Sequence, residues 1–211
     1  MTLGGFPEPP NILDVRVTGQ LDGDGFIIQN MVYRTRPGLW VTANLYQPST
    51  TVKKMPGILI VHSHHRPKTQ GELQDMGMTW ARQGCLVLVI DLLGHGERAD
   101  HPFLSDRDYK EADSGFRWWR QDYYHRFDTN VQLHLVGQSL MGWIVWDLMR
   151  GVDLLLAQPD IDPDKVIILG AVAGGGDPAA VTAAVDPRIA AAVPFNFGGP
   201  QPETPFPLPE N

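Results

Sequence analysis

Two short apolar runs with a helical segment between them constrain the fold of this chain most. Residues 57–63, GILIVHS, and residues 85–91, CLVLVID, are apolar along most of their length, which is typical of strands covered on both faces. The segment between them, residues 71–84, has apolar side chains at helical spacing and ends at Gly84. Two strands joined by one crossover helix form a parallel pair. The sequence therefore predicts an α/β protein built on a βαβ unit.

The neighbouring segments extend this unit on both sides. Residues 26–35 and 39–48 are rich in β-branched and aromatic residues and flank the turn dipeptide Pro37-Gly38, so they predict an antiparallel hairpin. Further along the chain we expect a long helix, a buried strand, a short helix and a last strand. These elements cover residues 131–158, 162–170, 177–186 and 188–199, respectively.

Composition narrows the class of protein. The 211 residues are 43% hydrophobic and 19% charged, which fits one soluble domain. The formal net charge of −7 argues against a nucleic-acid or anionic-membrane surface, so we expect neither partner. We see no secretory signal and no apolar run of the roughly 18 residues that span a bilayer. The single Cys85 is expected to be a buried, reduced thiol, which favours a cytoplasmic location.

Two stretches do not follow the pattern of strands and helices. Residues 96–130 are polar and aromatic without a sustained period, and they are too long for an ordinary connection, so we expect a cap, a lid or an interface there. Residues 200–211 contain five prolines and predict neither a strand nor a helix. Without an internal repeat or a linker, residues 1–211 are interpreted as a single, incomplete domain.

Four local motifs, in this order, point to one family. The motifs are ANLYQP (43–48), ILIVHSHH (58–65), VLVIDLLGHGER (87–98), and DPDKVIILGAVAGGG with DPRIAAAVP (162–176 and 186–194). In them the chain resembles the α/β-hydrolases, and especially bacterial proteins of the acetyl-xylan-esterase and dienelactone-hydrolase type. The resemblance implies an α/β-hydrolase-like, mostly parallel sheet with helices on both faces, an N-terminal antiparallel hairpin and truncation after the sixth strand. It also implies a carboxylic-ester hydrolase without a cofactor.

In this family the nucleophile stands on a tight turn between a strand and a helix, in a G-x-S-x-G frame. The matching segment, ILGAVAGGGDPAA (168–180), contains no Ser, Cys or Thr. Counted from the strand, the frame places Val172 at the nucleophile position; counted back from the three glycines, it places Ala173 there. Both registers stay open, and neither supplies a nucleophile. Asp177, followed by Pro178, predicts a helix N-cap and hence a turn longer than a tight elbow.

The resemblance also assigns the surroundings of this turn. Backbone N–H groups of Ser63, His64 and Gly174 are expected to form the oxyanion hole. Substrate contact is expected from side chains in the same motifs and at the helix start, namely His65, His95, Glu97, Arg98 and Asp177. For the turn after the second parallel strand, which holds Asp91, Glu97 and Arg98, a salt-bridged loop is the main interpretation and substrate contact is the alternative.

Two other patterns are weaker. The segment VQLHLVGQSLMG mimics a strand, a G-x-S turn and a helix, which would make Ser139 a displaced nucleophile, but its apolar positions continue a helix. His64 or His65 together with His95 or His101 could bind zinc, because imidazole suits this ion. No established ligand spacing supports such a site, and we expect no metal.

The acid and the histidine of the family's triad follow the elbow on later strands. All seven histidines of this chain precede residue 168. We therefore expect the acid and the base on a second chain or a C-terminal segment that completes the sheet. A homo-oligomer is the alternative for covering the sheet edge.

Three functions stay open. The first is an esterase-like subunit acting on a small-molecule ester, in which the missing Ser reflects natural divergence, because the turn differs from the family at more than one residue. The second is a non-catalytic binding or scaffold subunit. The third, an anion site at the helix N-terminus, is disfavoured by the carboxylate of Asp177.

Overall fold

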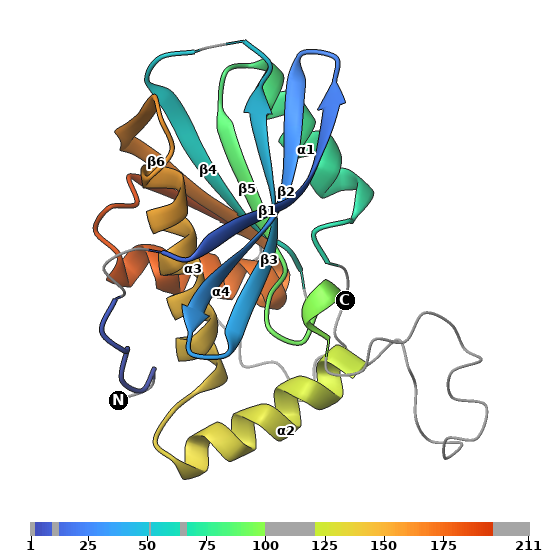
Figure 1. Ribbon diagram of the computed structural model, residues 1–211. Helices are drawn as coiled ribbons and strands as arrows, with labels where there is room; N and C mark the ends of the chain where they lie inside the picture. The colour runs from blue at the N-terminus through green and yellow to red at the C-terminus, as the bar shows by residue number, and fades with distance from the viewer. Residues whose placement is uncertain (1–2, 10–12, 51, 64–66, 100–120, 196–211) are drawn as a thin grey trace, which may run out of the picture.

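The computed structural model describes residues 3–9, 13–50, 52–63, 67–99 and 121–195. Its centre is a seven-stranded sheet in the order β1-β2-β3-β5-β4-β6-β7 (Figure 1). The strands are β1 (Val15–Gly23), β2 (Phe26–Arg36), β3 (Leu39–Pro48), β4 (Met55–Val61), β5 (Leu86–Ile90), β6 (Ile161–Ala171) and β7 (Ala191–Phe195). β1 to β3 are antiparallel to their neighbours, whereas β5, β4, β6 and β7 are parallel. The sheet is thus mixed, and the α/β class and the antiparallel start are confirmed.

Both faces of β4 and β5 are covered, which explains the continuous apolar sequence of these two strands. Leu59 and Val61 of β4 belong to the core that includes residues of α3 (Leu140–Leu156) and α4 (Val172–Val185). Ile58 and Ile60 belong to the opposite core, against α1 (Gly71–Arg82). Each fully buried side chain of this size contributes about 1.5–3 kcal/mol to folding. Figure 1 shows α1 on one side of the sheet and α3 and α4 on the other.

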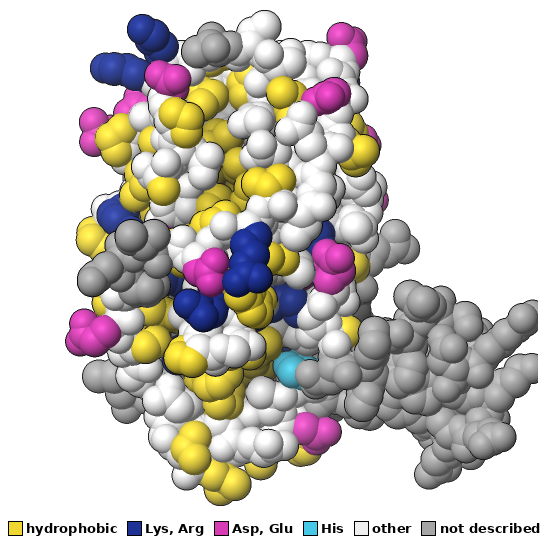
Figure 2. All heavy atoms as spheres, in the orientation of Figure 1, with side chains coloured by type: hydrophobic (Ala, Val, Ile, Leu, Met, Phe, Trp, Pro, Cys, Tyr) yellow, Lys and Arg dark blue, Asp and Glu magenta, His cyan; other side chains and the backbone are white. Residues whose placement is uncertain are grey.

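β1 is a strand that the sequence patterns do not predict. It pairs with β2 at the antiparallel edge, with a bulge between Val17 and Gly19, and most of its residues are exposed. Its apolar side chains Val17 and Leu21 contact too little of the core to be buried. Figure 2 views the face on which β1 crosses the sheet, where hydrophobic side chains are interspersed with charged ones. A strand with two exposed faces lacks the burial pattern by which strands are recognised.

The long helix expected over residues 131–158 is two helices. α2 (Gln121–Leu135) begins inside residues 96–130, which have no sustained sequence period, and α3 follows after a turn at Gly137, whose φ is +71°. Ser139 is the N-cap of α3, and its Oγ accepts a hydrogen bond of 3.0 Å from the Gly142 N–H. This capping role is a sufficient structural reason for a serine at this position.

The turn between β6 and α4 is shorter than expected. α4 begins at Val172, with Ala171 as its N-cap, so Asp177 lies inside the helix and the N-cap prediction for it is wrong. Pro178 is likewise inside α4. Residues 100–120, which form most of the expected cap, and residues 200–211 lie outside the described residues. None of the described helices is long and apolar enough to cross a membrane.

Candidate functional site

The carboxyl ends of three parallel strands bring the expected site segments together. Ser63 follows β4, Asp91 follows β5, and Val172 follows β6 directly. α2 lies across this end of the sheet (Figure 1). In open α/β sheets, ligands bind in the crevice outside the carboxyl ends of the strands. The three segments therefore define the candidate site.

Val172 has an unusual backbone conformation, with φ at +59°. Its neighbour Ala171 is extended, with φ at −125° and ψ at 148°, so the chain turns sharply between strand and helix at Val172. A left-handed conformation costs an ordinary residue about 1–2 kcal/mol and is rare for a β-branched one. Such strain persists only where the surrounding structure imposes it, and it is concentrated at functional sites.

Close backbone packing imposes this turn. A Cβ on Gly170 would collide with the carbonyl oxygen of Gly175, so strand and helix approach each other here without side chains between them. A Cβ on Gly175 would lie 2.6 Å from the Val61 carbonyl oxygen and 2.8 Å from that of His62. The first turn of α4 is thereby held against the end of β4, next to Ser63.

His62 is a buried residue that joins the ends of β4 and β5. Its Nε2 accepts a hydrogen bond of 2.9 Å from the Leu92 N–H, and its Nδ1 donates to the Ser63 carbonyl oxygen at 2.5 Å. These partners assign the neutral tautomer with the proton on Nδ1. Burial, followed by the nearby charge of His95, lowers the pKa of His62 to about 3. With both ring nitrogens engaged, His62 is a structural residue.

Asp91 lies at the centre of a buried ionic cluster. Its side chain has no exposed surface, and its carboxylate lies 2.5 Å from Lys68 Nζ, which also contacts the Glu97 carboxylate at 2.5 Å. The Lys68 N–H and the Thr42 hydroxyl donate to the same carboxylate. Burial raises the pKa of Asp91, but the charge of Lys68 and these hydrogen bonds outweigh it, so that the pKa lies below its usual value. Gly96 is required beside the cluster, because its φ is +56° and a Cβ would lie 2.5 Å from the Asp91 carboxyl group.

The turn after β5 is tied to α3 by a second buried ion pair. Arg98 Nη2 lies 2.8 Å from the Asp147 carboxylate, and each side chain is only 5% exposed. Arg98 also donates to the Asp91 carbonyl oxygen at 3.0 Å. Thr35 donates its hydroxyl proton to the other carboxylate oxygen of Asp147 at 2.6 Å. Arg98 is thus held in the protein interior, as expected for a salt-bridged loop.

The remaining residues expected to contact substrate have different surroundings. His95 is buried; its Nδ1 donates to the Leu93 carbonyl oxygen at 3.2 Å, and its Nε2 accepts from Arg126 at 3.2 Å. The Glu97 side chain is 71% exposed and bound to Lys68. Asp177 is half-buried in α4, and burial raises its pKa.

Three of the histidines considered for binding fall outside this description. His64 and His65, expected near the oxyanion hole and the substrate, and His101 lie outside the described residues. The described residues include no group of three or more His, Cys, Asp or Glu side chains that could hold a metal ion.

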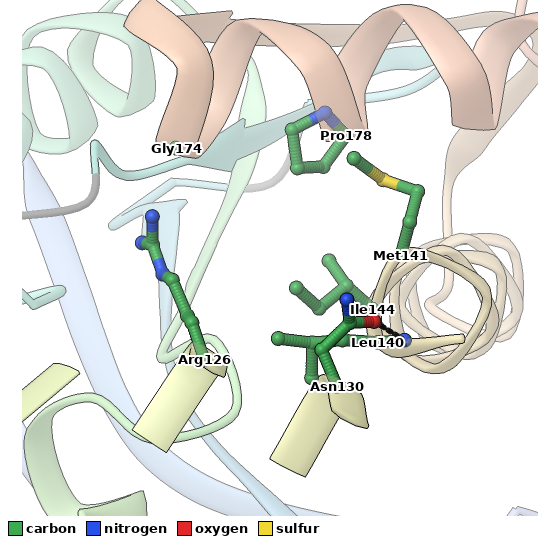
Figure 3. A pocket seen from close by; sticks show the side chains of 7 residues that line it. All are labelled: Arg126, Asn130, Leu140, Met141, Ile144, Gly174 and Pro178. Atoms are coloured by element: carbon green, nitrogen blue, oxygen red, sulfur yellow. Dashed lines mark hydrogen bonds between the residues drawn. The ribbon is translucent and has the colours of Figure 1, made fainter. Parts of the chain in front are cut away.

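A pocket of about 240 Å³ opens beside the turn between β6 and α4. It lies between α2, α3 and α4, as Figure 3 shows. Its lining residues are Arg126, Asn130, Leu140, Met141, Ile144, Gly174 and Pro178. Through Gly174, which is two residues after Val172, the pocket adjoins the turn that the family motif identifies.

The sequence patterns do not identify this pocket. Arg126 and Asn130 are four residues apart and so share one face of α2. This spacing would have been recognised if residues 121–135 had been predicted as a helix. The apolar lining residues Leu140 and Ile144 have the spacing of any buried helix face. From the sequence they therefore predict a helix that packs in the core, and not a pocket.

Comparison with known proteins identifies the family. A family model described as acetyl xylan esterase (AXE1) matches residues 26–197. YtaP of Bacillus subtilis (strain 168), which is named as a hydrolase, is 26% identical over 149 residues, covering 70% of this chain and 45% of that protein.

Solved structures share the fold at low sequence identity. A protein of Bacteroides fragilis NCTC 9343 described as an acetyl xylan esterase is 18% identical, with a TM-score of 0.67, over 89% of this chain and 48% of its own. The acetyl xylan esterase of Paenibacillus sp. R4 is 19% identical, with a TM-score of 0.63, over 88% of this chain and 53% of its own. The chain thus spans about half the length of these relatives. Because the family model matches most of its residues, the chain belongs to the acetyl xylan esterase (AXE1) family, with an α/β-hydrolase-like fold.

Proposed function

We propose that this protein is an esterase-like subunit that binds small ester ligands at the carboxyl ends of β4, β5 and β6, and in which Val172 occupies the position of the nucleophile. The observation that carries this proposal is the positive φ of Val172, at the junction of β6 and α4. A sharp strand-to-helix turn is what lifts a nucleophile out of an α/β-hydrolase sheet. Here the turn is kept and its side chain is an alkyl group.

This register changes one expected member of the oxyanion hole. The N–H of the residue after the nucleophile faces the oxyanion. With Val172 at that position, the following N–H belongs to Ala173 and not to Gly174. The second donor in our proposal comes from the segment that begins at Ser63 and continues to His64. Its support is the packing of Gly175 against the carbonyl groups of Val61 and His62, which brings these two segments together.

Nucleophilic attack also needs a base, and we find none among the described residues at these strand ends. His62 is neutral, buried and bonded through both nitrogens, and Asp91 is committed to Lys68. We propose that an acid and a histidine come from a further polypeptide segment or a second chain that pairs with β7. β7 supports this idea because, at the end of the described sheet, it exposes Val193 and Phe195.

A non-catalytic binding or scaffold subunit is the second candidate, and the alkyl side chain of Val172 itself favours it. A valine cannot form an acyl-enzyme. In either case we expect a cytoplasmic protein, because the one thiol, Cys85, is free and buried.

Substitution by serine tests both candidates. The V172S substitution and its matched control, A173S, are each made in the complete protein, which is purified together with any chain that accompanies it. Both variants are assayed with p-nitrophenyl acetate and with a fluorophosphonate probe. We expect the unsubstituted protein and A173S to be inactive, and V172S to gain hydrolysis and covalent labelling. Activity in A173S alone would contradict the assignment of Val172 to the nucleophile position. Inactivity of both variants would overturn the esterase-like proposal and leave the scaffold.

A further inference from the structure

We infer that a second pocket, at the amino ends of the parallel strands, binds a neutral sugar ring through its hydroxyl groups. The pocket lies where β3 ends and where β4, β5 and β6 begin. This end of the sheet is opposite the end that α2 lies across (Figure 1), so the inference goes beyond the proposed function. The volume of about 210 Å³ is that of roughly seven water molecules in the liquid, which suits a single ring.

The polar groups of the lining both donate and accept hydrogen bonds. Gln47 and Gln158 contribute carboxamides, and Ser49 and Thr50 contribute hydroxyl groups. Each of these groups is a donor and an acceptor at once. Gln158 Nε2 donates to the Leu154 carbonyl oxygen at 3.1 Å, which anchors the amide beside the end of α3 with one of its donors. Sugar hydroxyls also donate and accept, so they match this set of groups.

Asp160 adds a carboxylate to the lining. An ionised carboxylate only accepts hydrogen bonds, and its two oxygens can take protons from two neighbouring hydroxyl groups of one ring. Its negative charge also repels an anionic ligand at this short range. The carboxylate therefore favours a neutral polyhydroxylated ligand over an acid.

The apolar part of the lining suits the C–H groups of such a ring. Met55 and Leu86, at the first residues of β4 and β5, are buried, and Val52 is half-buried. Pro48 and Pro159 contribute rigid apolar rings from the two sides of the pocket. Binding sites for small molecules typically combine apolar contacts with a few polar groups that fix the orientation of the ligand.

The backbone around the pocket is held in an unusual conformation. Lys54 and Asp160 have φ values of +57° and +59°, and the Met55 N–H donates to the Asp160 carbonyl oxygen at 2.8 Å. This conformation is unfavourable for lysine, whereas aspartate adopts it more readily. Such strain persists only where the surrounding structure imposes it. Walls that are fixed before a ligand arrives reduce the entropy lost on binding.

Methyl β-D-glucopyranoside and cyclohexanol test this inference, because both are six-membered rings and only the first carries several hydroxyl groups. Binding to the complete protein is measured by NMR titration of its backbone amide signals. We expect the glucoside to bind at least fivefold more tightly than cyclohexanol and to shift signals around Gln47 and Asp160. Q158A should weaken the glucoside at least fivefold and change cyclohexanol less than twofold. Q132A, at an exposed glutamine of α2, is the matched control and should bind both probes like the unsubstituted protein.

A second variant keeps the test decisive if Q158A does not fold. Q47A removes the carboxamide at the end of β3, and it should also weaken the glucoside at least fivefold. Equal affinity for the two probes, or unchanged glucoside binding in the folded glutamine variants, would overturn the inference.

Two further probes examine the ligand class. Glucuronate should bind more weakly than the glucoside at low salt, and tighter binding would overturn the choice of a neutral ligand. Cellotetraose, compared at equal concentration of rings, should bind within twofold of the glucoside, because the pocket holds one ring. A larger gain would contradict a one-ring site. Hydrolysis by V172S tests the proposed function alone, whereas these titrations test the pocket alone.

Discussion

The ammonium of Lys68 and the carboxylate of Asp91 lie 2.5 Å apart, and neither side chain is more than 5% exposed. They connect the loop after β4 to the turn after β5, which are the two loops beside the elbow. Further bonds from Thr42 and the Lys68 backbone surround the same carboxylate. The site thus depends on a buried ion pair whose members are both satisfied, and such pairs are costly to break from one side.

We expect K68M to lower the free energy of unfolding by about 3–5 kcal/mol, because it leaves the Asp91 carboxylate buried without its cation. Urea denaturation followed by circular dichroism measures the change. The matched control is K165M, which removes a lysine that is 61% exposed from its ion pair with Asp162. This control should cost less than about 1 kcal/mol. An equal, small cost for both variants would show that Asp91 is not held as the structure describes.

His62 predicts how stability depends on pH. Its pKa is about 3 in the folded protein, against 6.5 ordinarily, so the unfolded chain binds the proton more readily between these values. The free energy of unfolding should therefore fall as the pH is lowered from about 6.5 toward 3, by at most about 1.4 kcal/mol per pH unit. The pKa of Asp91 is also lowered in the folded protein. Asp91 therefore reduces the free energy of unfolding further only near and below the ordinary pKa of an aspartate, where the unfolded chain binds the proton more readily than the folded protein.

Urea denaturation at half-unit steps from pH 7.5 to 4.5 separates this contribution. H62Q should be less stable at pH 7 and should show a flatter pH dependence. H134Q, which changes an exposed histidine at the end of α2, should keep the slope of the unsubstituted protein. A slope in H62Q as steep as in the unsubstituted protein would mean that other groups cause the pH dependence.

The sequence predicts the α/β class and the parallel strands because covered strands such as residues 57–61 and 86–90 must be apolar on both faces. It does not predict β1, whose apolar side chains are exposed, or the break before α3, which is made by a turn at Gly137 and the capping Ser139. For a different reason, the sequence does not decide which residue of the turn between β6 and α4 stands at the nucleophile position. Val172 and Ala173 are equally unreactive, and only the backbone shows which of them carries the positive φ.

The packing at the start of α4 predicts that Gly175 cannot be enlarged. G175A places a Cβ within 2.8 Å of two carbonyl oxygens of the β4 end, neither of which can move without displacing the strand. We expect a loss of at least about 2 kcal/mol in the free energy of unfolding. G71A is the control, because a Cβ there meets nothing within 4 Å at the start of α1 and should be neutral or slightly stabilising. A neutral result for G175A would contradict the close approach of α4 to β4.

The positive φ of Val172 predicts an unusual response to glycine. At an ordinary helical position, a half-buried valine loses both burial and helix propensity when it is replaced, so V172G should cost about 2 kcal/mol or more. At φ of +59°, glycine instead relieves a strain of about 1–2 kcal/mol. We therefore expect V172G to be close to neutral and A173G, one residue further into α4, to cost about 1 kcal/mol. Urea denaturation of both variants decides the register without any assay of activity. If A173G is tolerated and V172G is destabilised, the strained residue is not Val172, and the residue that we propose for the nucleophile position changes with it.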